Sequence, residues 1–165
     1  MKHIQPPTTD SGDDISQDRC YRYRLWRRWG NGDQMTFIGL NPSKANETVN
    51  DHTIRKCMGF ARRHSCEAIQ VLNLFALRES SPDLMRMHQH PFGPRNDQHL
   101  IKSANKSKLV VACWGARGRH MERDIRVSQL SSNHSIKLMC FGLTVGGFPR
   151  DPRPLSYTTT LVKYA

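Results

Sequence analysis

A chain of 165 residues can build one domain with a hydrophobic core and is too short for two comfortable ones. Its 25 lysines and arginines outnumber its 14 aspartates and glutamates, so the formal net charge is +11. Such an excess favours a polyanionic partner, nucleic acid first, over a basic surface that only confers solubility. No apolar stretch approaches the ~20 residues of a membrane span and no signal peptide is recognisable, so we expect a cytoplasmic protein without membrane contact.

The five cysteines indicate a reducing environment. Their number is odd, no two are spaced as C-x-x-C, and Cys57, Cys113 and Cys140 fall inside apolar runs, where cysteine behaves as a small hydrophobic residue. The pair His88 and His90 lies in a proline-rich loop without cysteine or carboxylate partners at the spacing of a zinc site. We therefore expect neither a metal ion nor another cofactor.

Residues 1–18 contain two consecutive prolines and almost no apolar side chains. We expect them to form a flexible tail ahead of a single domain at residues 19–165. From Cys20 to Trp29 aromatic and aliphatic residues alternate with arginines, which predicts a half-buried strand. The turn residues 30–33 favour a hairpin between this strand and the next one. The arginines of the strand at 20–29 either lie in solvent or contact nucleic acid.

The next three segments have the pattern of a βαβ unit. The apolar run at 35–40 predicts a buried strand, and this strand ends at Asn41 because a proline that cannot donate to a sheet follows it. One apolar face with i, i+3, i+4 and i+7 spacing predicts a helix at 51–63, capped by Asp51. A second strand is predicted at 68–75. This order implies parallel pairing through a right-handed crossover.

The remainder of the chain alternates helices and strands in the same way. The connection at 78–96 is long enough to carry function, and Ser81-Pro82 begins a short helix within it. Residues 142–157 are rich in glycine and proline and predict a rigid, basic loop. Between these two connections we predict a helix at 97–107, a strand at 108–115, a helix at 120–130 and a strand at 136–141.

This order predicts an α/β protein: a three-layer α/β/α sandwich around a central, mainly parallel four-stranded sheet, with an N-terminal antiparallel hairpin strand added to it. The carboxyl ends of parallel strands meet at one edge of a sheet, and open α/β folds bind their ligands there. Polar residues at the predicted strand ends should therefore share one site. They are Asn41, Ser43, Asn73, Arg117, Arg119, Arg150, Asp151 and Arg153.

Amides, a carboxylate and several guanidinium groups suit a polar, anionic ligand. The chain contains neither a Walker-type lysine loop nor a G-x-G-x-x-G motif. This absence disfavours nucleoside triphosphates and dinucleotide cofactors.

Four segments resemble motifs of the uracil-DNA glycosylase superfamily, and they occur in the order of that superfamily. The first looks like the form found in the mismatch-specific thymine/uracil branch, where asparagine replaces the water-activating aspartate. The others are similar to the strand whose asparagine reads the base, to the Leu-Trp-Gly strand end, and to the His-Pro-Ser-Pro-Leu-Ser loop that presses into the minor groove. In chain order the four are Gly39-Leu40-Asn41-Pro42, Val71-Leu72-Asn73, Ala112-Cys113-Trp114-Gly115-Ala116 and Asp151-Pro152-Arg153-Pro154-Leu155-Ser156. More closely, residues 19–164 resemble a bacterial and phage family of uncharacterised domains with the same Leu-Asn-Pro-Ser opening.

The resemblance implies a catalytic pair and a base pocket. Asn41 would hold the attacking water, and Asp151, which stands where the superfamily has histidine, would stabilise an oxocarbenium-like sugar or take a proton. A flipped base would contact Asn73 and Ser43 and stack on a phenylalanine. The candidates for stacking are Phe75 and Phe148, and those for phosphate contacts are Lys44, Arg117, Arg119, Arg150 and Arg153.

We therefore expect a monomeric, monofunctional DNA glycosylase that acts on double-stranded DNA. It would remove a damaged or hypermodified base and leave an abasic site, in repair or in defence against phages with modified DNA. Two alternatives from other classes stay open: a non-catalytic DNA-binding module on the same scaffold, and an enzyme of free nucleosides or nucleotides, which would need no large basic face. Lys44 lies three residues after Asn41 and leaves a lyase step open, although a phosphate contact is the simpler role for it.

Overall fold

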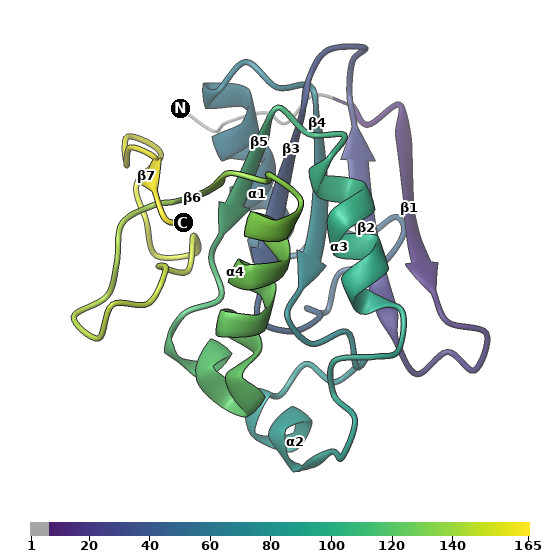
Figure 1. Cartoon of the computed structure of the whole chain (residues 1–165). Coiled ribbons are helices and arrows are strands. Elements are labelled where there is room, and N and C mark those ends of the chain that lie inside the picture. Colours follow the sequence, from purple (N-terminus) through teal and green to yellow (C-terminus); the bar gives the residue numbers. More distant parts are fainter. Residues whose placement is uncertain (1–6) are drawn as a thin grey trace.

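The computed structural model describes residues 7–165, in which seven strands form one sheet with helices on both faces (Figure 1). The strand order is β1-β2-β4-β3-β5-β6-β7. The strands are β1 (Asp10–Ile15), β2 (Arg22–Arg28), β3 (Gln34–Gly39), β4 (Ala68–Asn73), β5 (Leu109–Ala112), β6 (Leu138–Cys140) and β7 (Val162–Lys163). The helices are α1 (His52–Arg63), α2 (Pro82–Met87), α3 (Asn96–Ala104) and α4 (Arg123–Asn133), with a 3-10 segment, η1 (Ala116–Glu122), before α4.

The α/β class is confirmed, and the prediction of a four-stranded, mainly parallel sheet is wrong in size and balance. Strands β4, β3, β5 and β6 pair in parallel in the middle of the sheet. Antiparallel pairings of β1 with β2, β2 with β4, and β6 with β7 extend both flanks. Within residues 7–165, the antiparallel pairings are therefore as many as the parallel ones.

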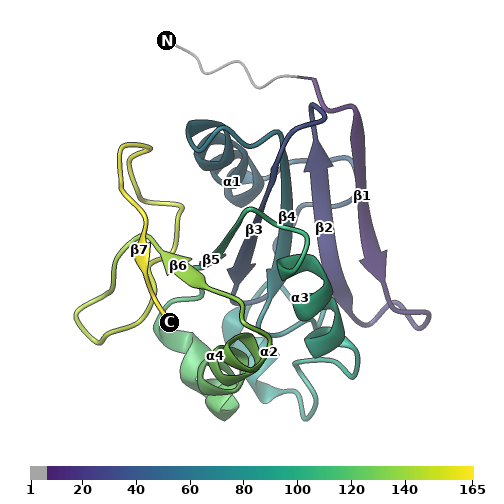
Figure 2. The same ribbon diagram turned by 45° about the horizontal axis from the view of Figure 1, so that its top comes forward.

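The two faces of the sheet carry separate hydrophobic cores, because side chains alternate along each strand. On β3, Met35 and Phe37 pack with α1, whereas Ile38 packs with α3 and α4. Two views related by a rotation agree that α1 covers one face and that α3 and α4 cover the other (Figure 1, Figure 2). The central strands are thus buried on both sides, which explains why they read as continuous apolar runs.

Strand β1 lies within the predicted flexible tail, so that prediction is wrong for residues 10–15; residues 1–6 are outside the described part of the chain. β1 pairs with β2, and Gly12 lies against the ring of Trp26. A Cβ atom at Gly12 would come within 2.3 Å of that ring, so the close approach requires glycine. Three of the six residues of β1 are aspartate. A polar edge strand of this kind carries no hydrophobic signal that sequence reasoning can detect.

The predicted hairpin between β2 and β3 is also wrong, because β4 lies between these strands. β4 pairs antiparallel with β2 and parallel with β3. The connecting turn crosses the start of β4, where the Trp29 N–H donates to the Glu67 carbonyl at 3.0 Å and the Glu67 N–H donates to the Asp33 carbonyl at 2.8 Å. Turn residues predict a reversal of the chain, but the packing of the whole sheet decides which strands become neighbours.

The helix predicted at 51–63 is confirmed as α1, with Asp51 as its cap. α2 begins with a proline directly after its cap, as predicted. α4 begins later than predicted because the preceding residues form η1, which ends in left-handed backbone at Met121 and Glu122. None of the helices in the described part of the chain is long and apolar enough to cross a membrane.

Candidate active site

The carboxyl ends of β3, β4 and β5 open into a cavity of about 620 Å³. Because these strands are parallel, the loops that follow them reach the same edge of the sheet. The start of α2, two residues of α1 and the loop after β6 complete the wall. The predicted site residues in this wall are Asn41, Ser43, Asn73, Arg117, Asp151 and Arg153.

Asn41 is held at the end of β3 by its own side chain. The amide nitrogen donates to the carbonyl oxygen of Glu79, in the segment before α2, at 2.6 Å. The main chain on either side is also fixed, since the Phe75 N–H donates to the Leu40 carbonyl at 3.0 Å. With one N–H engaged, the side-chain oxygen and the second N–H of Asn41 remain for a ligand or a water molecule.

Asn73 lies next to Asn41 at the end of β4 and is 6% exposed. Its amide is satisfied when the nitrogen donates to two backbone carbonyls, that of Asn41 after the end of β3 and that of Leu72 in β4, each at 3.2 Å. Gly39 makes this possible, because a Cβ atom there would lie 2.8 Å from the Asn73 amide. The side chain of Asn73 is therefore hydrogen-bonded directly to the main chain of Asn41.

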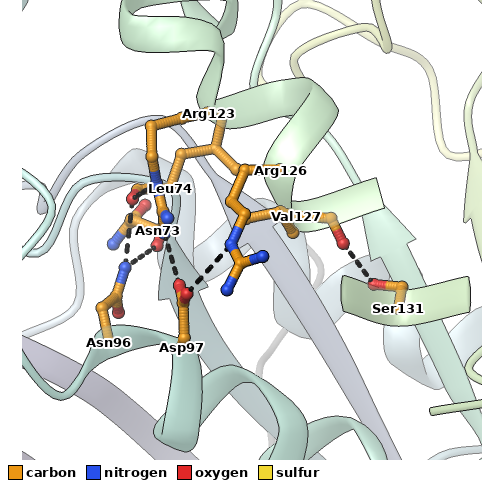
Figure 3. A network of polar contacts seen from close by, with 8 residues as sticks. All are labelled: Asn73, Leu74, Asn96, Asp97, Arg123, Arg126, Val127 and Ser131. Atoms are coloured by element: carbon orange, nitrogen blue, oxygen red, sulfur yellow. Dashed lines mark hydrogen bonds and ion pairs between the residues drawn. The ribbon is translucent and has the colours of Figure 1, made fainter. Parts of the chain in front are cut away.

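Residues of α3 and α4 hold the end of β4 (Figure 3). The fully buried Asn96 donates to the carbonyls of Asn73 at 2.8 Å and Leu74 at 3.0 Å. Arg123, also buried, donates to the Leu74 carbonyl at 3.1 Å and pairs with Asp97 at 2.9 Å. Carbonyls beyond the end of a strand need such partners when they are buried. The position of Asn73 is thus set by α3 and α4, which the sequence did not indicate.

Asp151 both lines the cavity and caps a turn. One carboxylate oxygen accepts the backbone N–H of Arg153 at 2.8 Å, the pattern of an Asx turn. The guanidinium of Arg153 pairs with the same carboxylate, with its Nε 2.9 Å and its terminal nitrogen 2.5 Å from Oδ2. These hydrogen bonds raise the pKa of Arg153 above its usual value. In the structure both oxygens of the Asp151 carboxylate therefore already accept hydrogen bonds from Arg153.

Two cysteines in the cavity wall are thiols and not thiolates. Burial raises the pKa of Cys57 and of Cys113 well above the usual value, and the nearby charge of Asp151 adds to the shift in both. The thiol of Cys113 donates to the Ile38 carbonyl at 3.4 Å. Because a nucleophilic cysteine needs a lowered pKa, this environment argues against cysteine catalysis.

Ser43 lines the cavity, but its hydroxyl is already engaged by Asp51, the cap of α1. Burial raises the pKa of Asp51, and hydrogen bonds from Ser43, the Ile54 N–H and the Ala45 N–H outweigh that effect and lower it. The carboxylate accepts the Ile54 N–H at 2.9 Å and the Ala45 N–H at 3.3 Å. Ser43 thus joins the strand-end loop to the helix start.

Buried arginines of β2 hold the loop that follows Asn41. A bulge in the pairing of β1 with β2 shifts the alternation of β2, so that Arg22 and Arg27 face the same side. Arg22 donates to the carbonyls of Ala45 and Ser43, and Arg27 donates to the Asn46 carbonyl. Burial lowers the pKa of both arginines. The expectation that the β2 arginines lie in solvent or contact nucleic acid is therefore wrong for these two.

The two phenylalanines predicted to stack on a base do not line the cavity. Phe75 is 0% exposed and packs against His120, so the prediction that it stacks on a ligand is wrong. Phe148 is half-buried, and the guanidinium of Arg119 lies 5.3 Å from its ring centre. Phe75 lies in the same core as Leu72 and Leu74, beneath the helices. The alternation along β4 therefore stops after the strand ends at Asn73, since it would have placed Phe75 on the cavity side.

The remaining predicted phosphate contacts, Lys44, Arg119 and Arg150, are exposed but stand outside the cavity wall. Arg119 also pairs with Asp124 at 3.0 Å. Leu155, in the loop that resembles the minor-groove motif, is 4% exposed and packs in the core beside α1. This leucine is not available at the surface.

Several wall residues were not predicted as site residues. Thr53 and Cys57 come from the first turns of α1, four residues apart, and Ser80 and Pro82 come from the start of α2. A helix that follows a βα loop begins at the carboxyl edge of the sheet, so its first turn was a signal that could have found Thr53. Trp114 also lines the cavity and is 3% exposed.

The chain belongs to the family described as "Protein of unknown function (DUF1643)", whose model matches residues 22–153. No curated protein matches the chain. No solved structure matches it either. The matched range contains Asn41, Asn73, Asp151 and Arg153, so the whole candidate site lies within the family domain.

Proposed function

We propose that this DUF1643 protein is a monofunctional DNA N-glycosylase, which hydrolyses the bond between a sugar and a damaged or hypermodified base and leaves an abasic site. One observation carries the proposal. The segments that resemble the four glycosylase motifs lie far apart in the chain, and each supplies residues to one cavity at the carboxyl edge of β3, β4 and β5. Parallel pairing brings the ends of these strands together, and open α/β folds bind their ligands at that edge, so polar groups of this chemistry in one cavity there support a binding site.

Size and charge support a nucleic acid substrate. A cavity of about 620 Å³ falls within the usual range for ligand pockets. Arg117 and Arg153 stand in its wall, and the chain as a whole carries a formal charge of +11. Enzymes that act on a base in duplex DNA must rotate the nucleotide out of the helix into such a pocket while cations hold the flanking phosphates.

Asn41 suits the role of positioning the attacking water. Its nitrogen is fixed by the Glu79 carbonyl, so its oxygen has one defined direction in which to accept a hydrogen bond. An amide is a poor base, which is compatible with a reaction in which the glycosidic bond breaks largely before water attacks. The negative charge of Asp151 would then stabilise the positive charge that develops on the sugar.

Asn73 suits the role of reading the base edge through its oxygen, because its nitrogen donates to backbone carbonyls. The apolar sides of the pocket come from Pro42, Pro82 and Trp114 in place of Phe75. Asp151 stands where the superfamily has histidine, which points away from uracil and toward another base. A hypermodified base of phage DNA, with defence as the setting, and a damaged cellular base are the two forms of this proposal.

The test is a search for abasic sites. The purified protein is incubated with duplex DNAs that contain uracil, deaminated bases, or hydroxymethylated and glucosylated phage bases, and strand cleavage at abasic sites is measured after alkali treatment. We expect cleavage on one substrate and a loss of roughly 100-fold or more with Asn41→Ala. Asn31→Ala, an exposed asparagine in the turn before β3, is the matched control and should keep full activity. Wild-type rates with Asn41→Ala would refute the mechanism.

A second function is favoured by a specific observation. The amide nitrogens of Asn41 and Asn73 and the carboxylate of Asp151 all have partners within the protein. Groups that are engaged in this way suit a non-catalytic DNA-binding module, because such a module needs no free catalytic groups. Salt-dependent duplex binding with no abasic sites on any substrate would decide for this module.

A further inference from the structure

In the ion pair between Asp151 and Arg153, a single residue among those described supplies all the hydrogen-bond donors to the carboxylate. Across the described residues, each hydrogen bond that the carboxylate of Asp151 accepts comes from Arg153, from either its backbone N–H or its guanidinium. Both residues line the cavity. The group best placed to stabilise positive charge in the cavity is thus covered by a cation from two residues further along the same loop.

The two carboxylate oxygens are held differently. Oδ1 accepts the backbone N–H of Arg153 at 2.8 Å, in addition to its Nε at 3.1 Å. Oδ2 accepts only from the guanidinium, at 2.9 and 2.5 Å. Pro152 lies within this turn and Pro154 follows it, and both restrict its backbone. The main-chain contact therefore persists if the guanidinium moves away, and Oδ2 alone becomes free.

The guanidinium can exchange partners at low cost. The side chain of Arg153 is 58% exposed and that of Asp151 is 37% exposed, so water competes with their pairing. A phosphodiester offers two anionic oxygens that accept the same bidentate fork of N–H groups. A strand of nucleic acid at the cavity mouth thus presents a direct substitute for the carboxylate.

We propose that Arg153 is a positioning residue that acts as a phosphate-displaced latch on Asp151. In the free protein the guanidinium covers Oδ2; when a backbone phosphate of DNA takes the guanidinium, Oδ2 is released into the cavity while Oδ1 stays fixed by the turn. The inference rests on the proposed function for the identity of the anion. It deepens that function, because Asp151 becomes available only when the polymer backbone is bound, and free nucleosides without a phosphate cannot release it.

The latch predicts a coupling between the two residues that binding alone can measure. The dissociation constants of the wild type, Asp151→Asn, Arg153→Gln and the double variant for one fluorescent duplex are determined by anisotropy at a single salt concentration. Asparagine keeps the turn, because its side-chain oxygen still accepts the Arg153 N–H. Asp151→Asn should bind roughly two- to fivefold more tightly than the wild type, because Arg153 no longer has to leave a carboxylate.

The latch requires that the gain in DNA affinity from Asp151→Asn depends on Arg153. In the Arg153→Gln background, Asp151→Asn should give a clearly smaller gain, which reports only the removal of a negative charge near DNA. Asp33→Asn, which removes a carboxylate at the start of β3, is the control for overall charge and should leave affinity nearly unchanged. An equal gain with and without Arg153, no gain at all, or no duplex binding by any of the four proteins would overturn the latch.

The abasic-site assay on the same samples separates this inference from the proposed function. Coupling without abasic sites would keep the latch and reject the glycosylase. Abasic sites without coupling would keep the glycosylase and reject the latch. The absence of both would reject both.

Discussion

A groove of about 890 Å³ lies between β1, β2 and α3, and it is larger than the cavity of about 620 Å³ at the strand ends. In the groove, polar side chains pair with one another: Asp14 with Arg24 at 2.7 Å, and Tyr23 with His99 in a stack whose ring centres are 4.7 Å apart. In the cavity, Asn41 and Asn73 come from separate strand ends and are fixed by main-chain carbonyls. The comparison teaches that the volume of a hollow and the convergence of rigidly held groups are separate properties, and the proposed function rests on the second.

The rigid support of the cavity can be broken at Arg123. Arg123→Met removes a buried guanidinium that holds the Leu74 carbonyl and Asp97. Because both partners are then left without it, we expect a loss of about 3 to 5 kcal/mol in the free energy of unfolding. Arg126→Met is the matched control, since Arg126 lies on the same helix, is exposed and pairs with Asp97 at 3.6 Å. Urea unfolding measures both, and equal losses would contradict the role of burial.

Two arginines of β2 allow the cavity and the groove to be compared directly. Loss of Arg22, which holds the loop beside the cavity, should lower the free energy of unfolding more than loss of Arg24, which lies in the groove. Arg22→Met removes the donor to the Ala45 and Ser43 carbonyls and should cost about 2 to 3 kcal/mol. Arg24→Met removes a half-buried ion pair in the groove and should cost less than about 1 kcal/mol. Hydrogen exchange should quicken at residues 43–50 in the first variant alone. Exchange that stays slow there would show that the loop does not need Arg22.

The thiols sharpen the comparison by reporting on the cavity wall. Since burial raises the pKa of Cys57 and Cys113, little thiolate is present at pH 8, and both should react with iodoacetamide on the order of 100-fold more slowly than the exposed Cys20. Mass spectrometry of peptides at successive times gives the three rates. Labelling of all three at one rate would mean that the wall opens to solvent.

The smallest effect is expected in the groove, at His99. Burial lowers its pKa, opposed by the charge of Asp14, so the neutral form is favoured in the folded protein. The neutral His99 therefore contributes fully to the free energy of unfolding above pH 6.5, the usual pKa of histidine in an unfolded chain. This contribution is lost as the pH falls below that value. We expect a loss of less than about 1 kcal/mol by pH 5, because the side chain is partly exposed.

His99→Gln should reduce this pH dependence of the unfolding free energy, measured with urea at several pH values. His52→Gln, an exposed position on α1, is the control and should leave the pH dependence as it is in the wild type. A pH dependence that is unchanged in His99→Gln would place the titrating group elsewhere.

Local patterns predicted the elements that carry their own signal. The apolar face and the cap at Asp51 predicted α1, and the apolar runs before Asn41 and through Asn73 predicted β3 and β4. Parallel pairing then follows from the order strand, helix, strand, and it brings the strand ends together. This chain of reasoning accounts for the convergence of Asn41, Asn73 and Asp151 on one cavity.

The supporting residues could not be predicted in this way, because their roles arise between elements distant in the chain. Asn96 and Arg123 read as ordinary polar residues at helix starts, yet both reach the end of β4. Arg22 and Arg27 read as the polar side of a strand, until a bulge and the loop above them place both in the interior.

The sequence by itself determined the α/β class, the central βα order and the polar residues at the strand ends, because periodicity, caps and proline act over a few residues. Only the tertiary structure decided that β4 separates β2 from β3, that a strand of aspartates closes the edge, and that Phe75 points into the core. It also decided that Arg153 covers Asp151. These outcomes depend on which surfaces meet, and burial and charge pairing between distant segments select them.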